Sequence, residues 1–201
     1  MAKLTDQIPQ HRQNRCGSKP IFINRWSPRA MTGETIADEV LMGLFEAAHW
    51  AMSSNNNQPW RFIYARRDHS DWNKFLGLLA EGNRVWCVNA AMLMVMVAKT
   101  TFDNGKPART HAFDTGAAWG MFALEGASRG LVVHGMQGFD YDRAKSELGV
   151  PDGYEVQAMA AVGILADADT LPEPYREREK PSTRKELAGI AAEGGFTENI
   201  R

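Results

Sequence analysis

A run of polar side chains interrupts an otherwise apolar part of the chain at residues 53–58, which read Ser-Ser-Asn-Asn-Asn-Gln. Each of these side chains can donate and accept hydrogen bonds, and such residues favour turns because they bond to nearby backbone. A polar turn of this kind can bind the hydrogen-bonding edge of a heteroaromatic ligand, with Trp60 packed nearby. It can equally be a loop whose side chains satisfy only their own backbone.

A second group of residues with binding chemistry is Asn-Arg-Trp-Ser-Pro-Arg at residues 24–29, where two guanidiniums flank a hydroxyl. Arginine presents a planar fork of donors that matches phosphate oxygens, and serine adds another hydrogen bond without adding charge. The grouping therefore suits a phosphate. Arginines on protein surfaces are more often solvated or paired with carboxylates, so these residues alone leave both interpretations open.

Two further segments suit a ligand site. Glycines 135 and 138 would let backbone amides approach a flat ligand, because no Cβ stands in the way. The polar connection at residues 100–110 contains Gly105 and Pro107, and we expect a mobile loop close to whatever the protein binds.

Length and composition indicate one globular domain. The chain has 201 residues, of which 44% are hydrophobic, and its 23 basic and 24 acidic side chains give a net charge of −1, so no overall field attracts nucleic acid or an acidic membrane. Cys16 and Cys87 form neither a metal-ligand spacing nor a disulfide framework. The first 19 residues contain no apolar leader, and the longest apolar run, residues 90–98, is too short to span a bilayer. These features predict a cytoplasmic protein.

The elements that must position the polar turn are a helix and a strand. Apolar spacing predicts a helix over residues 35–51, with Thr35 and Asp38 as a capping box, and a strand over residues 61–65. Residues 20–23 are expected to be extended. A short helix should end near residue 79, with Gly82 in the left-handed position that closes it.

The remaining pattern alternates strands and helices. Residues 90–98 lack polar alternation, which predicts a strand covered on both faces. The helix at residues 114–130, capped by Asp114, is rich in small residues, which suits either a core helix or a dimer seam. Further elements are expected as strands over 131–134 and 156–165 and helices over 142–148 and 186–192. Residues 1–19 are an N-terminal extension, and residues 20–201 form one domain with a charged C-terminal arm from about residue 172.

Together these segments resemble the nitroreductase family of FMN-dependent flavoproteins. The resemblance rests on Arg25-Trp26-Ser27-Pro28-Arg29 and on the helix that leads to residues 53–60, and it covers nearly the whole chain from Phe22. It implies an α+β fold with a central, mainly antiparallel sheet wrapped by helices. It also implies an intertwined homodimer with two FMN sites at the interface.

The resemblance assigns roles to individual residues. Four segments match cofactor-binding positions of the family. They are the phosphate segment Arg25, Trp26, Ser27 and Arg29 with Arg184 of the tail; Ser53, Ser54 and Asn56, which approach the flavin from the partner subunit; Asn83 at the pyrimidine edge; and Gln137 and Gly138 beside the flavin N5. Two residues depart from the family pattern. Met52 stands where the family often has proline, and Gln137 stands where many members have an acidic residue. We expect the change at Gln137 to alter substrate preference or flavin potential.

The implied activity is hydride transfer from NADH or NADPH through FMN to nitroaromatics, quinones or a related electrophile, by a ping-pong mechanism without a catalytic side chain or a metal. Two alternatives remain open at this point. One is a specialised reduced-flavin chemistry, dehalogenation or flavin fragmentation, with residues 100–110 as a lid. The other is a flavin-binding protein without enzymatic activity.

Overall fold

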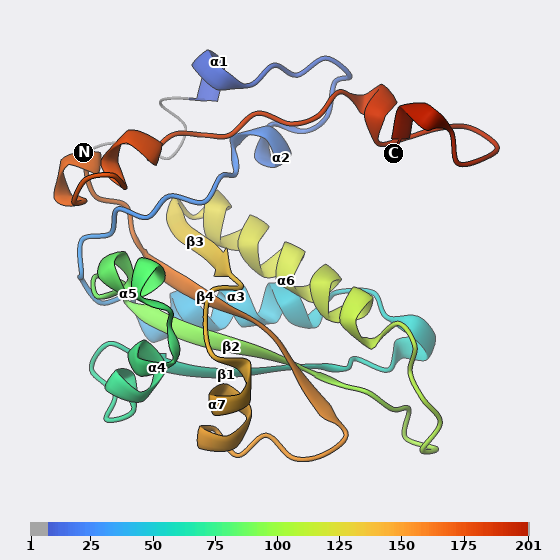
Figure 1. The fold of residues 1–201 in the computed structure, drawn as a ribbon, viewed down its shortest axis with the longest axis horizontal. Coiled ribbons are helices and arrows are strands. Elements are labelled where there is room, and N and C mark those ends of the chain that lie inside the picture. The colour runs from blue at the N-terminus through green and yellow to red at the C-terminus, as the bar shows by residue number, and fades with distance from the viewer. Residues whose placement is uncertain (1–7, 201) are drawn as a thin grey trace.

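Four strands form one antiparallel sheet in the computed structural model, which describes residues 8–200 (Figure 1). The order across the sheet is β1 (Trp60–Arg66), β2 (Met92–Lys99), β4 (Tyr154–Ile164) and β3 (Leu131–Met136), and every neighbouring pair is antiparallel. Helices pack on both faces of this sheet. The expected α+β fold with a central antiparallel sheet wrapped by helices is confirmed.

The strand β2 lies inside the sheet, and its side chains alternate between two cores. The odd-numbered side chains from 93 to 97 join one core with buried side chains of α4 (Trp72–Leu78) and α5 (Glu81–Cys87). The even-numbered side chains from 92 to 96, all methionine, join the other with α3 (Asp38–His49) and α6 (His111–Ser128). A strand buried on both faces needs apolar side chains at every position, which explains the unbroken apolar run.

Two expectations about the first helices are wrong. Residues 20–23 are not extended but belong to α2 (Pro20–Asn24), which proline can begin because its fixed φ suits the first helical turn, where its missing N–H is not needed. The capping box of Thr35 and Asp38 does not form, because α3 begins after Ala37 without a side-chain cap. The carboxylates of Asp38 and Glu39 in the first turn favour that helix terminus electrostatically instead.

Two further boundaries differ because tertiary contacts decide them. Gly82 does not close a helix but lies with Asn83 inside α5, since the preceding helix already ends at Leu79, which forms an isolated bridge with Phe139. Asp114 does not cap α6, which begins after Thr110. The buried carboxylate of Asp114 instead accepts hydrogen bonds from Ser54 N and Thr110 Oγ1, both at 3.1 Å.

The helix α6 has one buried and one exposed face. Its buried side chains pack against α3 and the sheet. The other face carries exposed or half-buried small and apolar residues at helical spacing, namely Phe113, Gly116, Ala117, Gly120 and Leu124. The helix is thus part of the core and also carries an uncovered small-residue stripe.

The two ends of the chain lie side by side. In Figure 1 the C-terminal arm runs along the top of the molecule next to the N-terminal segment that contains α1 (Ile8–His11). Arg12 Nε donates to Ser182 O at 2.8 Å, and Arg15 pairs with Glu186. The expected helix at residues 186–192 is only the 3-10 turn η4 (Leu187–Gly189). Residues 1–7 of the predicted extension lie outside the described part of the chain.

The remaining short elements are the helix α7 (Tyr141–Glu147), which contacts α4, and the 3-10 turns η1 (Ser54–Asn56), η2 (Ala168–Thr170), η3 (Arg176–Arg178) and η5 (Glu198–Ile200). Over residues 8–200, no helix has the length and apolar character that a bilayer crossing requires.

Candidate functional site

Arg25 and Arg184, from opposite ends of the chain, lie close enough to influence each other. Burial lowers the pKa of the Arg25 guanidinium, and the positive charge of Arg184 lowers this pKa further. Arg25 Nη1 donates to Ser27 Oγ at 3.3 Å, so the predicted serine lies beside the predicted arginine. Trp26, between them, is buried. The fold therefore places Arg25, Ser27 and Arg184 near one another.

Arg25 and Arg184 also lack an acidic partner within residues 8–200. Among the described residues, the side chain of Arg25 donates only to Ser27, and that of Arg184 donates to backbone oxygens and to the hydroxyl of Ser182. Neighbouring cations without a counter-ion raise the energy of one another, and an oxyanion between them would relieve the repulsion. The arrangement therefore suits an anion.

Arg29 is placed differently from Arg25. The backbone N–H groups of Arg29 and Ala30 donate to Glu179 Oε1 at 2.6 and 2.8 Å, and Arg29 Nη1 lies 3.9 Å from Glu179 Oε2. Glu179 is buried, with only 6% of its surface exposed. Arg29 thus ties its loop to the C-terminal arm. The sequence alone did not identify Glu179, because it lies in a run of charged residues and nothing in that run distinguishes it from its neighbours.

A second residue that the sequence did not single out, His134 on β3, supports the same loop. Its Nδ1 donates to Pro28 O at 2.8 Å, and its ring lies 4.7 Å from the Trp86 ring. Burial lowers the pKa of His134 to about 4, and the nearby charges of Arg29 and Arg25 act in the same direction. His134 is therefore neutral at physiological pH. Its hydrogen bond holds residues 25–30, called the arginine loop below, against the sheet.

Asn83 and Gly138, predicted at one edge of the flavin, are in contact although they come from separate elements. Asn83 Nδ2 on α5 donates to Gly138 O at 3.0 Å in the loop after β3. A Cβ at residue 138 would lie 2.7 Å from that nitrogen, so glycine is required for this approach. Gln137, next to Gly138, is exposed.

A cavity of about 470 Å³ connects the arginine loop with the sheet. Its walls come from α2, the arginine loop, the exposed stripe of α6 and β3, through the residues Phe22, Arg25, Ser27, Trp119, Gly120, Ala123, Leu124 and Gly135. This volume lies within the range of small-molecule sites.

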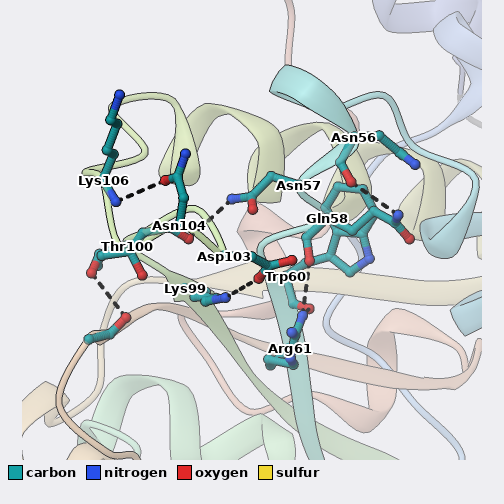
Figure 2. Close-up of polar contacts among 12 residues, drawn as sticks. Asn56, Asn57, Gln58, Trp60, Arg61, Lys99, Thr100, Asp103, Asn104 and Lys106 are labelled. Carbon is teal, nitrogen blue, oxygen red and sulfur yellow. Dashed lines mark hydrogen bonds and ion pairs between the residues drawn. The ribbon is translucent and has the colours of Figure 1, made fainter.

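The polar turn at residues 53–58 has an unusual backbone. Asn55, Asn56 and Gln58 have positive φ values of 52°, 53° and 47°, a left-handed conformation that asparagine tolerates better than most residues. Within the turn, Ser53 Oγ accepts from Gln58 N at 3.0 Å. Gln58 Nε2 donates to Asn56 O at 3.2 Å, as Figure 2 shows. Ser53 and Gln58 thus satisfy the turn itself, whereas the Asn56 side chain is exposed and bonds to no described residue.

The loop at residues 100–110, which we expected to be mobile, has regular backbone pairing. It forms a short hairpin in which Thr101 pairs with Pro107, Phe102 N donates to Lys106 O at 2.9 Å, and Lys99 Nζ lies 2.6 Å from Asp103 Oδ1. Figure 2 shows this hairpin facing the polar turn, and Asn57 Nδ2 donates to Thr101 O at 3.4 Å.

The polar turn lies far from α5, the helix that carries Asn83. In Figure 1 the cyan turn after α3 stands at the end of the molecule opposite α5. Ser53, Ser54 and Asn56 of one protomer therefore do not meet Asn83 of the same protomer. That these residues serve a partner subunit stays a prediction of the family resemblance.

Comparisons with known proteins agree with this geometry. The model of the nitroreductase family matches residues 23–86 and 78–164. A protein of Mycolicibacterium smegmatis, uncharacterized and of 15.4 kDa, is 36% identical over 143 residues, which are 67% of this chain and 95% of that protein. A Streptomyces coelicolor protein, provisionally named an NADH dehydrogenase/NAD(P)H nitroreductase, is 29% identical over 140 residues, or 60% of this chain and 69% of that protein.

Solved structures show the same architecture. The crystal structure of an oxidoreductase containing FMN has a TM-score of 0.89 and 44% identity and covers 92% of this chain and 96% of its own. A provisionally named nitroreductase from Desulfovibrio desulfuricans, in complex with FMN, has a TM-score of 0.69 at 23% identity, covers 90% and 99%, and shares the fold. With its sheet, its arginine loop and a family match over most of its length, the chain belongs to the nitroreductase family.

Proposed function

We propose that this protein is an FMN-dependent oxidoreductase that moves hydride from NADH or NADPH through the flavin to nitroaromatics, quinones or a related electrophile in a ping-pong cycle. The proposal is carried by Arg25 and Arg184, which lie near each other without an acidic partner among residues 8–200, and by the cavity that Arg25 lines together with Gly135 of β3. The FMN named in the 44% identical structure supports it.

The phosphate of FMN suits the arginine cluster. Arg25 and Arg184 lack carboxylate partners among the described residues, and Ser27 offers a hydroxyl next to Arg25. Trp26 contributes through its backbone, while Arg29 holds the loop through Glu179. A site that ends at one phosphate favours FMN over FAD.

The ring of the flavin suits the contact between α5 and the loop after β3. Asn83 would present its amide to the pyrimidine edge, and the backbone at Gln137 and Gly138 would lie near N5, where no Cβ at residue 138 obstructs. Bound FMN supplies the hydride acceptor and donor at N5. The residues of this chain bind and orient the ring, and no acid or base side chain is assigned a step.

The second half of each site comes from a partner subunit in this proposal. Ser53, Ser54 and Asn56 stand too far from Asn83 within one protomer, so we place them on the flavin of the other. The stripe on α6 supplies an apolar surface for a homodimer, and Phe113 on this stripe is 76% exposed in the isolated chain. The hairpin at residues 100–110 would then border the partner's site.

Anaerobic stopped-flow mixing tests the function. Purified protein should carry FMN, NADH or NADPH should bleach it, and a quinone or nitroaromatic added afterwards should restore the oxidised spectrum without reduced nicotinamide. Bound FMN that neither NADH nor NADPH reduces would refute the proposal and indicate a binding protein. Halide release from halogenated substrates, or breakdown of FMN in air, would instead indicate specialised reduced-flavin chemistry.

A further inference from the structure

A cavity of about 570 Å³ lies between the N-terminal segment and the C-terminal arm, next to the proposed phosphate site. Its lining is strongly basic and includes His11, Arg12, Arg15, Arg184 and Lys185, against the single carboxylate of Glu186. Phe22 lines both this cavity and the smaller one at Arg25.

Arg12 joins the three segments that surround this region. Its Nη1 donates to Ile23 O at 2.8 Å and to Arg25 O at 2.7 Å, and its Nε donates to Ser182 O at 2.8 Å. One guanidinium thus links the N-terminal segment, the loop that carries Arg25, and the arm that carries Arg184. Because Arg12 bonds to Arg25 through its carbonyl, it positions the backbone from which that side chain extends.

Arg12 also lacks an acidic partner among residues 8–200, and no described residue accepts from its Nη2. Arg12 lines one cavity together with Arg184 and bonds to the carbonyl of Arg25, so the three cations lie near one another. Burial lowers the pKa of Arg12, and the charges of Arg184 and Arg25 lower it further. Arg15, on the same segment, differs because it pairs with Glu186 on the exposed surface. Three like charges held together without an anion oppose the docking of both chain ends.

We propose that Arg12 is a positioning residue that couples the docking of both chain ends to the phosphate of the flavin. Without an anion, repulsion among Arg12, Arg25 and Arg184 loosens the N-terminal segment and the arm. A phosphate monoester at Arg25 and Arg184 removes that repulsion, and the three carbonyl bonds of Arg12 then hold both ends in place. This inference rests on the proposed FMN site.

Comparison of FMN with riboflavin, which lacks the phosphate, tests the role of Arg12. We expect Arg12→Ala to weaken FMN binding by about ten-fold and riboflavin binding by less than about two-fold. Arg15→Ala, the matched control, should change both by less than about two-fold. Unchanged FMN affinity in Arg12→Ala, or equal losses for both ligands, would overturn the proposal, since a merely structural role does not distinguish the two.

Hydrogen exchange on the wild-type protein tests the coupling without any substitution. FMN should slow amide exchange in residues 8–24 and 182–190, and riboflavin at equal saturation should not. Equal protection by both ligands, or protection by neither, would overturn the coupling even if Arg12→Ala fails to fold. A wild-type protein that binds neither flavin would instead refute the proposed function itself.

Discussion

Arg25 and Arg29 belong to one short loop, yet the structure gives their side chains different surroundings. Arg25 lies near Arg184 and has no carboxylate partner among residues 8–200, whereas Arg29 lies beside buried Glu179. The resemblance to the nitroreductase family predicted both as phosphate ligands. Residue types could identify the loop, but only the position of Glu179, 150 residues away along the chain from Arg29, separates the two roles.

Alanine substitutions should separate the two arginines. Arg25→Ala removes a charge-assisted contact worth on the order of 1.5–3 kcal/mol, so FMN affinity should fall roughly ten-fold to a hundred-fold with little change in the melting temperature of the apoprotein. Arg29→Ala should lower the free energy of unfolding by about 1–3 kcal/mol, because it leaves a buried carboxylate without its cation. Titration with FMN and urea unfolding measure the two effects. Unchanged FMN affinity in Arg25→Ala would remove that residue from the site.

His134 predicts a dependence of stability on pH. Its pKa is about 4 in the folded protein and about 6.5 when unfolded, so between these values the unfolded chain binds a proton that the folded chain does not. Stability should therefore fall as pH drops through this window. From about pH 7.5 to about pH 5, the free energy of unfolding should fall by about 2 kcal/mol more in wild type than in His134→Gln. The measurement uses the two apoproteins at one concentration. If their free energies of unfolding fell equally between these pH values, the pKa of His134 would be the same in the folded and unfolded chains.

At the scale of elements, long periodic segments were predictable and their ends were not. The strand β2, the helices α3 and α6 and the strand β4 follow from apolar spacing, because each buries whole faces. The wrong predictions concern helix ends that are set by residues far away in the sequence. Leu79 pairs with Phe139 at the end of its helix, and Asp114 accepts a hydrogen bond from Ser54 instead of capping its own helix. Local sequence identifies neither partner.

The contact between α5 and the loop after β3 gives a prediction at this scale. Gly138→Ala places a Cβ 2.7 Å from Asn83 Nδ2 and must displace that amide. Gly138→Ala and Asn83→Ala should each weaken FMN binding several-fold, by about 1 kcal/mol, and the double variant should be no worse than either alone, because both remove the same contact. Titration with FMN gives the affinity of the two single variants and the double variant, which together form a double-mutant cycle. Fully additive losses would show that the two residues act independently.

At the scale of the whole molecule, one protomer keeps the polar turn away from α5 and carries an uncovered stripe on α6. The fold was predictable from the sequence by resemblance to the family. The distance between the polar turn and Asn83 was not, because it depends on how the elements pack around the sheet.

A charge on the stripe should separate the subunits. Gly116 is exposed and a Cβ there meets nothing within 4 Å, so Gly116→Arg should leave the protomer folded. It should nonetheless oppose burial of the stripe, which contributes roughly 25 cal/mol per Å² of apolar area removed from water. Sedimentation velocity, recorded at protein and flavin absorption, should show a monomer poor in FMN, with Gly116→Ala as the dimeric control. Gly120 is less suitable because it lines the same cavity as Arg25.

A soluble Gly116→Arg monomer that retains full FMN would contradict the shared site. A dimer of unchanged stability would instead show that the stripe lies outside the interface.

The shared site is tested most directly by a heterodimer that carries different defects in its two subunits. One subunit carries Arg25→Ala, and the other carries Ser54→Ala with Asn56→Gly, which removes both side chains and keeps the left-handed backbone at residue 56 available. Each altered homodimer should bind FMN weakly. The heterodimer is co-expressed with a different tag on each subunit. If each site combines Arg25 of one subunit with Ser54 and Asn56 of the other, one site of the heterodimer contains all the substitutions and the other site is wild type.

The measurement is the amount of FMN bound per heterodimer, followed by anaerobic reduction with the nicotinamide that reduces the wild-type protein. We predict one FMN per heterodimer, bound with wild-type affinity and bleached at the wild-type rate. A heterodimer that binds FMN no better than the two altered homodimers would contradict the account, because it would show that each site is built within a single chain.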